Sequence, residues 1–256
     1  MLTVRAPAKL TVSLRVTGVR ADGYHELDAE MVTLSLADEL VIGDGDHGLV
    51  VEAAPWVRAG GLPAPDDNLI GRALAASGRR AAVRLVKYIP LGAGLGGGSA
   101  DAAAILRWAG VTDPALAAGL GADVPFCVVG GRARVEGIGE RVSALEHVRR
   151  DYLLLLPPFG VDTAAVYRAW DDEPNHEGPN ELTAAALATE PRLAGWRDAL
   201  GDLAGNEPRL AGSGSTWFVE GGPAEAGTEA APELRLKDEA ARLVRVHTVP
   251  AGWEGD

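Results

Sequence analysis

The chain has 256 residues, of which 47% are hydrophobic, and its 24 basic and 36 acidic residues give a net charge of −12. This acidic balance repels nucleic acid and anionic membranes at long range, so it argues against partners of both kinds. No segment approaches the roughly 20 apolar residues of a membrane span, and the one cysteine excludes an internal disulfide, so we expect a cytoplasmic protein.

The first half of the chain alternates segments that are typical of strands with segments that are typical of helices. Alternating apolar residues predict strands, and apolar residues three and four apart predict helices, which glycine often ends. In chain order the predicted elements are strands Leu2–Val16 and Met31–Ile42, helix Asp67–Ser77 with Asp66 or Asp67 as cap, strand Ala82–Ile89, a helix that runs from Ala102 to Gly110, helix Pro114–Leu120, and strands Phe126–Val129 and Arg132–Gly137.

A domain boundary is predicted near Arg149–Leu156, because the apolar strand Tyr152–Leu156 is followed by Pro157 and Pro158. We therefore divide the chain into residues 1–150 and 151–256, and we expect the second part to be α+β. Its predicted elements are helices Asp162–Trp170, Asn180–Ala188 and Leu193–Leu203, strand Trp217–Val219, a mobile loop Gly221–Ala231, and strand Leu243–Val249.

The most informative segment is PLGAGLGGGSADAA, residues Pro90–Ala103, which places a glycine-rich loop between a strand and a helix. Glycine lacks a Cβ, so its backbone can adopt positive φ and approach a ligand closely. The unpaired N–H groups at the start of the following helix can bind an anion, and Ser99 is a candidate N-cap or phosphate contact. The spacing fits neither the Walker nor the dinucleotide pattern. A flexible loop is the alternative, but the strand–loop–helix order favours a phosphate site.

Asp123 is the best candidate for a general base. It follows Gly121 at a predicted turn, and the apolar Val124, Pro125 and Phe126 that come after it could partly desolvate its carboxylate. The alternative is that Asp123 only caps a helix or a turn.

Three motifs in this order resemble those of the GHMP kinases, a family named for galactokinase and for homoserine, mevalonate and phosphomevalonate kinases. They are APAKLTVSLRVTG with RADGYHEL (Ala6–Leu27), the glycine loop, and LAGSGST (Leu210–Thr216). The resemblance implies an α+β, two-domain fold, in which a ribosomal-protein-like N-terminal domain and a ferredoxin-like C-terminal domain enclose the active site in a cleft.

Within the family, the strings ADGYHEL, GLGGGS and GADVPF (Gly121–Phe126) are similar to those of members that phosphorylate the 2-hydroxyl of 4-diphosphocytidyl-2-C-methyl-D-erythritol. The resemblance therefore implies an ATP-dependent small-molecule kinase of the non-mevalonate isoprenoid pathway, which uses Mg²⁺ and is a monomer or a weak homodimer. Two alternatives stay open, namely a kinase for another alcohol, such as homoserine or mevalonate, and a nucleotide-binding homologue without catalysis.

The resemblance also assigns roles to residues. Asp123 is expected to be the catalytic base, and Lys9 is expected to lie near the acceptor hydroxyl. Substrate binding is expected from Thr11, Tyr24, His25, Thr163, Tyr167, Gly212, Ser213 and Gly214, with Tyr24, His25 and Tyr167 around the cytosine ring. ATP binding is expected from Asn68, Lys87, Pro90, Leu91, Gly92, Ala93, Gly94, Leu95, Gly96, Gly97, Gly98, Ser99 and Ala100.

The sequence departs from the family pattern at two of these positions. Thr11 stands where an asparagine is usual, and Ala100 stands where a second serine usually follows Ser99. Both changes shorten or remove a polar side chain, so one substrate contact and one phosphate or magnesium contact are in doubt. For Asp101 the sequence leaves two roles open, a link to phosphate through magnesium and a favourable charge at the helix N-terminus.

Overall fold

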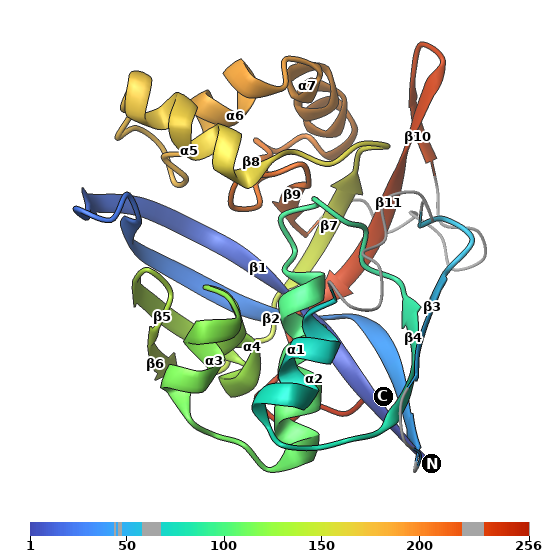
Figure 1. Cartoon of the computed structure of the whole chain (residues 1–256). Helices are drawn as coiled ribbons and strands as arrows, with labels where there is room; N and C mark the ends of the chain where they lie inside the picture. The colour runs from blue at the N-terminus through green and yellow to red at the C-terminus, as the bar shows by residue number, and fades with distance from the viewer. Residues whose placement is uncertain (44, 46–47, 58–67, 222–232, 256) are drawn as a thin grey trace.

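The computed structural model describes residues 1–43, 45, 48–57, 68–221 and 233–255, and its strands form two sheets (Figure 1). The first sheet contains β1 (Leu2–Val19), β2 (His25–Gly43), β3 (Gly48–Ala53), β4 (Ala82–Lys87), β5 (Arg132–Gly137) and β6 (Arg141–Leu145). The second contains β7 (Asp151–Leu156), β8 (Arg209–Leu210), β9 (Trp217–Glu220), β10 (Glu233–Leu236) and β11 (Glu239–His247).

The first sheet is built around the long antiparallel hairpin of β1 and β2. The strand order is β3-β4-β2-β5-β6, and β1 pairs with β2 outside this path. Only the β3–β4 pair is parallel among the described strands. The β1–β2 register shifts between Pro7 and Lys9 and again between Thr11 and Ser13, so the two polar residues of this strand that were assigned to the site lie between two irregularities of the ladder.

The second sheet has the order β10-β11-β7-β9-β8, with β7 in its centre. Successive side chains of a strand point in opposite directions, so the unbroken burial of the run YLLLL means that both faces of β7 are covered. Leu153 and Leu155 pack into a large core that also includes α-helical side chains. Tyr152, Leu154 and Leu156 pack into a smaller cluster on the other face.

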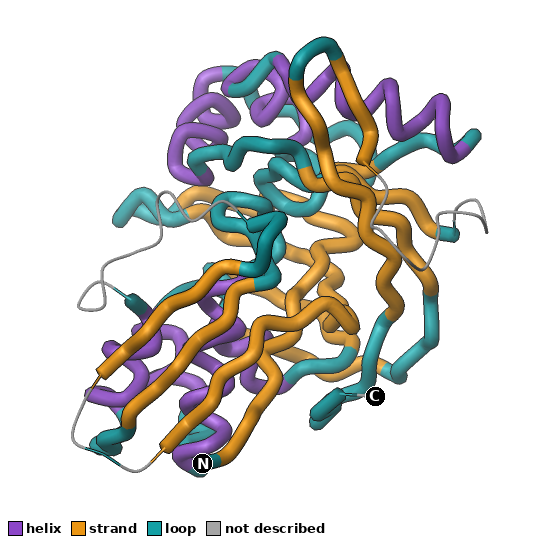
Figure 2. The backbone as a smooth tube through the Cα atoms, turned by 90° about the vertical axis from the view of Figure 1, so that its right-hand side faces the viewer, coloured by secondary structure: helices purple, strands orange, loops and turns teal. Residues whose placement is uncertain are grey.

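Helices cover the outer faces of both sheets (Figures 1 and 2). They are α1 (Leu69–Ala76), α2 (Gly97–Ala109), α3 (Pro114–Leu120), α4 (Val124–Val129), α5 (Thr163–Asp172), α6 (Thr183–Thr189) and α7 (Arg192–Ala204). Helix α2 contacts β1 and β2, and α7 contacts β9 and β10. Among the described residues, no helix is both long enough and apolar enough to cross a membrane.

The smaller cluster joins the two sheets to the glycine loop. It unites Leu10 of β1, Leu34 of β2, Leu154 of β7 and two apolar residues of the loop, Ala93 and Leu95. Ala93 is 4% exposed and Leu95 is 1% exposed, so the loop contributes every second side chain of this stretch to the interior. The loop therefore lies between the two halves of the molecule.

The predicted elements agree with the structure apart from one element of the wrong type, several shifted ends and four short strands that were not predicted. The segment Phe126–Val129 was predicted as a strand, but it forms helix α4, with Pro125 in its first turn and Gly130 at its end. A buried apolar run of four residues has no periodicity that separates a strand from a helix. Helix α2 begins at Gly97 rather than Ala102, and its N-cap is Gly96, so Ser99 is not the cap.

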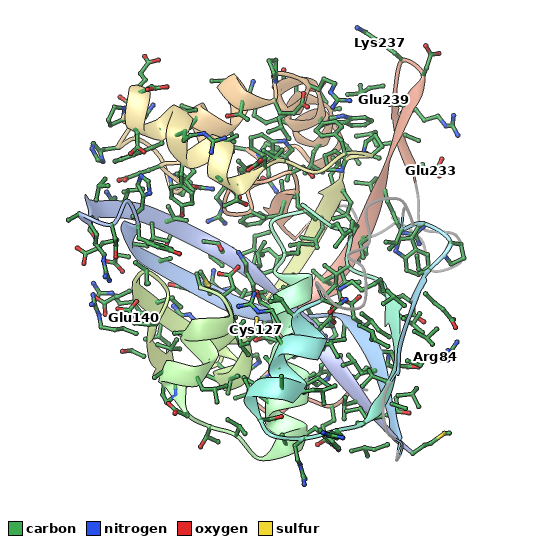
Figure 3. The ribbon with its side chains drawn as sticks, in the orientation of Figure 1. Arg84, Cys127, Glu140, Glu233, Lys237 and Glu239 are labelled. Atoms are coloured by element: carbon green, nitrogen blue, oxygen red, sulfur yellow. The ribbon has the colours of Figure 1, made fainter. Side chains whose placement is uncertain are left out.

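Other differences concern the ends of elements and short strands. β2 begins six residues before the predicted Met31, at His25, and helix α1 is capped by Asn68, whereas Asp66 and Asp67 lie outside the described residues. Most of the loop predicted at 221–231 also lies outside them. The sequence did not predict β3, β6, β8 or β10. Strand β10 forms a hairpin with β11 that projects from the molecule, with Lys237 at its tip (Figure 3).

Candidate active site

The loop between β4 and α2 follows a path that only glycine allows at several points. Gly94 and Gly96 have φ of +76° and +65°, values in the left-handed region. A Cβ on Gly94 would lie 2.2 Å from the carbonyl oxygen of Ala211, and a Cβ on Gly96 would lie 2.8 Å from Cγ of Lys9. The glycines therefore let the loop touch both the LAGSGST segment and the side chain of Lys9.

The amide groups at the start of α2 are available to a ligand. The first hydrogen bond of the helix runs from the N–H of Ala100 to the carbonyl of Gly96, so the N–H groups of Gly97, Gly98 and Ser99 precede the helical ladder. These three residues line a cavity of about 390 Å³. Free N–H groups at the positive end of a helix are suited to an anion such as a phosphate.

Lys9 and Asp123 meet in the same cavity. Nζ of Lys9 lies 3.4 Å from Oδ2 of Asp123 and donates a hydrogen bond of 3.1 Å to Oγ1 of Thr11. Lys9 is 6% exposed, whereas the Asp123 side chain keeps 31% exposure. Asp123 occupies the N-cap position of α4, yet its side chain makes no capping hydrogen bond. The carboxylate is thus directed to the lysine and the cavity, where it can accept a proton.

The other end of the cavity is aromatic. Tyr167 of α5 lines it, and the ring of His25 lies against Tyr167 at a tilt of 32°, with 4.6 Å between centroids. Nε2 of His25 lies 2.7 Å from Oδ1 of Asp171, also on α5. Thr163, one turn before Tyr167, shares a hydrogen bond of 2.8 Å with the hydroxyl of Ser213. A planar ring beside this cluster could stack and form hydrogen bonds at its edge.

Comparison with known proteins gives this geometry its context. The chain is 39% identical over 234 residues to a 4-diphosphocytidyl-2-C-methyl-D-erythritol kinase of Paracoccus denitrificans, in an alignment that covers 83% of the chain and 84% of the relative. A relative with the same name from Moorella thermoacetica is 41% identical, with 79% and 76% covered. The chain belongs to this kinase family. No protein-family model matches the sequence.

Solved structures agree with membership of the 4-diphosphocytidyl-2-C-methyl-D-erythritol kinase family. A crystal structure of 4-(cytidine 5'-diphospho)-2C-methyl-D-erythritol kinase is 36% identical, with a TM-score of 0.69 and coverage of 88% of this chain and 90% of the other. A mevalonate kinase structure has a TM-score of 0.61 at 11% identity, with 98% and 100% covered, and shares the fold alone. The expected GHMP kinase fold of α+β class is confirmed.

Most of the residues that the family motifs indicated line this same cavity. They are Lys9, Thr11, Lys87, Pro90, Leu91, Gly92, Ala93, Gly94, Leu95, Gly96, Gly97, Gly98, Ser99, Asp123, Thr163, Tyr167, Gly212 and Ser213. His25 reaches it only through Tyr167, and Tyr24 is 59% exposed at the end of the β1–β2 hairpin. Asn68 caps α1 by accepting a hydrogen bond of 3.0 Å from the N–H of Ile70. Gly214 is not among the lining residues, and a Cβ on it would lie 3.3 Å from Cδ1 of Leu210.

Lys87 lies beneath the glycine loop in a buried group of three ionisable side chains. Its Nζ donates to Oδ2 of Asp101 at 2.7 Å and also to Oδ2 of Asp38, and all three side chains are at most 3% exposed. Burial lowers the pKa of Lys87, but Asp101 and Asp38 outweigh it, so the net pKa is raised. Burial also raises the pKa of Asp101. Asp101 therefore pairs with Lys87 in the interior behind the glycine loop, a role that the sequence did not suggest.

Asp38 and the apolar wall of the cavity are the site features that sequence reasoning missed. Oδ1 of Asp38 accepts hydrogen bonds from the N–H groups of Tyr88 and Ile89, so this carboxylate fixes the chain just before the glycine loop. An acidic residue inside the mostly apolar strand LSLADELVIG is the signal that could have identified it, although Glu39 beside it gives the same signal. The wall contains Leu14, Leu27, Met31, Leu69, Ile89, Ala122, Val135, Ile138 and Gly139.

The departure at Ala100 falls on a residue that faces the interior. Ala100 is 1% exposed and belongs to the large hydrophobic core, whereas the preceding Ser99 lines the cavity. A hydroxyl at position 100 would need a partner inside that core. The methyl group of alanine fits this position without such a partner.

Proposed function

We propose that the chain transfers the γ-phosphoryl group of ATP to the 2-hydroxyl of 4-diphosphocytidyl-2-C-methyl-D-erythritol, in the non-mevalonate isoprenoid pathway. The observation that carries the proposal is the meeting of Lys9 and Asp123 at the end of the glycine loop, in one cavity with Tyr167. The named relatives at 39% and 41% identity support this acceptor over homoserine or mevalonate, whose kinases resemble the chain in fold alone.

In the proposed reaction Asp123 accepts the proton of the acceptor hydroxyl. The oxygen forms a bond to the γ-phosphorus, the bond from that phosphorus to the oxygen bridging it to the β-phosphorus breaks, and ADP leaves. Lys9, 3.4 Å from Asp123, supplies positive charge beside the attacking oxygen, and Thr11 holds the ammonium group in place. Each residue thus acts where charge changes during the transfer.

The glycine loop is proposed to bind the phosphates of ATP through the N–H groups of Gly97, Gly98 and Ser99. Mg²⁺ prefers oxygen ligands and keeps several waters, so phosphate oxygens and water would supply most of its ligands. The hydroxyl of Ser99 lines the cavity and would be the side-chain oxygen of this helix turn available to the ion. The ion would neutralise charge on the transferred group. Lys87 and Asn68 would act from behind the loop, since one is paired with two aspartates and the other caps α1.

The aromatic end is proposed to bind the cytosine of the acceptor. Support comes from the adjacent rings of His25 and Tyr167 and from the hydrogen bond between Thr163 and Ser213. Tyr24, at the exposed end of the hairpin, would move onto the base when it binds. Gly212, Ser213 and Gly214 would face the diphosphate.

Three coarser features complete the proposal. We divide the chain into domains 1–150 and 151–256. The two sheets support this division, because the last strand of the first sheet ends at Leu145 and the first strand of the second sheet begins at Asp151. We propose a cytoplasmic location and a monomer or weak homodimer. The net charge of −12 supports the view that nucleic acid is not a partner.

The test is to incubate the purified protein with ATP, Mg²⁺ and the cytidine compound and to measure ADP. No ADP above the control without acceptor would overturn the assignment, and homoserine and mevalonate in parallel reactions test the alternatives. Asp123→Asn is expected to abolish turnover while the affinity for ATP stays within about twofold, because the amide cannot accept the proton. Asp113→Asn is the matched control, since Asp113 caps α3 away from the cavity and asparagine caps equally well.

A further inference from the structure

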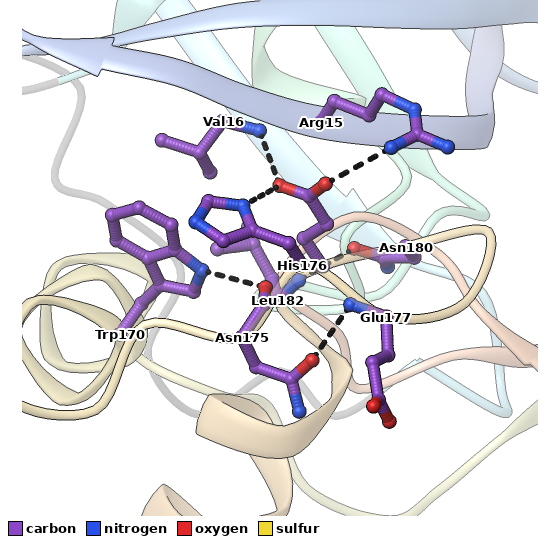
Figure 4. Close-up of polar contacts among 9 residues, drawn as sticks. Arg15, Val16, Trp170, Asn175, His176, Glu177, Asn180 and Leu182 are labelled. Carbon is purple, nitrogen blue, oxygen red and sulfur yellow. Dashed lines mark hydrogen bonds and ion pairs between the residues drawn. The ribbon is translucent and has the colours of Figure 1, made fainter.

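The segment that connects α5 to α6 crosses to the first sheet and binds β1 (Figure 4). The N–H of Leu14 donates to the carbonyl of Pro179 at 2.9 Å, and the N–H of Glu181 donates to the carbonyl of Leu14 at 3.0 Å. These bonds form a single parallel bridge between Leu14 and Asn180. The strand that carries Lys9 and Thr11 is therefore fixed to the second half of the chain a few residues beyond them.

Glu181 strengthens the same junction. One of its carboxylate oxygens accepts from the N–H of Val16 at 2.9 Å and lies 3.1 Å from Nδ1 of His176. The other lies 3.4 Å from the guanidinium of Arg15. The Glu181 side chain is only 2% exposed, so its charge is held by groups from both halves of the molecule.

Asn180 uses its whole side-chain amide at this junction. Nδ2 donates to the carbonyl of Leu210 at 2.9 Å and to the carbonyl of Gly212 at 2.7 Å, and Oδ1 accepts from the N–H of Leu182 at 3.0 Å. The residue is 3% exposed. Two donors and one acceptor on a planar group are what an asparagine offers and an aspartate does not. Asn180 therefore holds the LAGSGST segment by two of its carbonyls.

One of the two carbonyls that Asn180 holds belongs to Gly212, which lies beside the reacting groups. Gly212 has φ of +58°, and a Cβ placed on it would lie 3.5 Å from Nζ of Lys9 and 3.6 Å from Oγ1 of Thr11. The next residue, Ser213, bonds to Thr163. The position of Gly212 thus sets the space in which the ammonium group of Lys9 and the acceptor lie.

We propose that Asn180 is a positioning residue for the phosphoryl transfer, which acts on the acceptor side of the cavity through Gly212 and Lys9. The inference rests on the proposed function. The glycine loop has its own attachments to the LAGSGST segment, since Ser215 donates to the carbonyl of Gly92 at 3.1 Å and Thr216 to that of Ala93 at 3.2 Å. Loss of the Asn180 amide leaves these bonds in place. The acceptor side is then disturbed and the ATP side is not.

Asn180→Asp tests whether Asn180 affects the acceptor side of the cavity and not the ATP side. The variant keeps the size of the side chain and the oxygen that binds Leu182, but it replaces the donating NH₂ by an oxygen that faces two carbonyls. We expect kcat to fall and the KM for the cytidine compound to rise, each on the order of tenfold, with the KM for ATP unchanged within about twofold. Asn175→Asp is the matched control, because Oδ1 of Asn175 only accepts from the N–H of Glu177 and the aspartate preserves this bond.

Two further measurements keep the test independent of folding and of activity. Hydrogen exchange of the amides at 211–216, measured without substrates, is expected to quicken in Asn180→Asp and not in Asn175→Asp. If Asn180→Asp does not fold, Gly212→Ala displaces the same contact from the cavity side, and it should give the same pattern of kcat and KM.

Wild-type kinetics in both Asn180→Asp and Gly212→Ala would overturn the inference. So would equal rises of the KM for ATP and of the KM for the acceptor in Asn180→Asp without faster exchange at 211–216. A wild-type protein that forms no ADP overturns the proposed function instead, and the exchange measurement still tests the contact.

Discussion

Gly96→Ala is the substitution that most directly perturbs the proposed catalytic pair. The added methyl group would lie 2.8 Å from Cγ and 3.2 Å from Cε of Lys9, and 3.6 Å from Oδ2 of Asp123. Real Cβ atoms do not come as close as 2.8 Å to another heavy atom, so the lysine must move. Its Nζ then loses its place 3.4 Å from Asp123 and 3.1 Å from Thr11.

The effect has one component in stability and one in catalysis. An alanine at φ of +65° costs about 1 to 2 kcal/mol of folding free energy, and overpacking against Lys9 adds about 1 to 3 kcal/mol. A displacement of a catalytic group by about 1 Å lowers kcat on the order of a hundredfold, which corresponds to about 3 kcal/mol in the barrier. The loss of rate should therefore exceed what a small decrease in stability explains.

Gly110→Ala separates the two components. Gly110 ends the same helix with φ of +73°, but a Cβ there would have no heavy atom within 4 Å, so this variant carries the backbone strain alone. The assay is ADP formation at saturating substrates, with thermal unfolding of both variants in parallel. Equal kcat in folded Gly96→Ala and Gly110→Ala would refute the reasoning that the loop positions Lys9.

Three further predictions concern residues around the cavity. Asp171→Ala removes the partner of Nε2 of His25 and should raise the KM for the cytidine compound about fivefold, as expected for one hydrogen bond of about 1 kcal/mol, while the KM for ATP stays constant in the same assay. The raised pKa of Asp101 means that its carboxyl group binds a proton more tightly in the folded protein than in the unfolded chain. The free energy of unfolding should therefore fall as the pH rises from about 4 to about 8. Urea titrations at several pH values should show a smaller fall for Asp101→Asn. Burial raises the pKa of Cys127 to about 12, so a thiol reagent should label it on unfolding and far more slowly in the native protein; rapid native labelling would contradict this.

Most of the residues that the motifs indicated line one cavity, whereas several elements around that cavity were not predicted. Local signals identify the glycine loop, because strand, glycines and helix are contiguous in the chain. Lys9, Asp123 and Gly212 are far apart in sequence, and only the family motifs brought them into one prediction. The pairing of Lys87 with Asp38 and Asp101 was not predicted. Hydrophobic periodicity indicates which side chains are buried, but not which ionisable side chains of a sheet and a helix come into contact.

The errors in secondary structure have a common physical origin. Helix α4 and the short strands β6 and β8 are decided by neighbours rather than by local preference. The run Phe126–Val129 packs as a helix beside α2, and β8 exists only because it pairs with β9. The ends of β1 and β2 were likewise underpredicted, because each strand is extended by its partner in the hairpin.

The burial of Ala93 and Leu95 has a consequence for how tightly a nucleotide can be held. The carbonyls of Gly92, Ala93 and Leu95 accept hydrogen bonds from Val161, Thr216 and Lys9, so side chains and carbonyls fix the loop from both halves of the molecule. A free glycine-rich loop would lose conformational entropy when it closes on phosphate, at about 1 to 2 kcal/mol for each residue that becomes ordered. In this protein the loop is ordered by folding, so the free energy of the proposed phosphate contact would be retained as affinity.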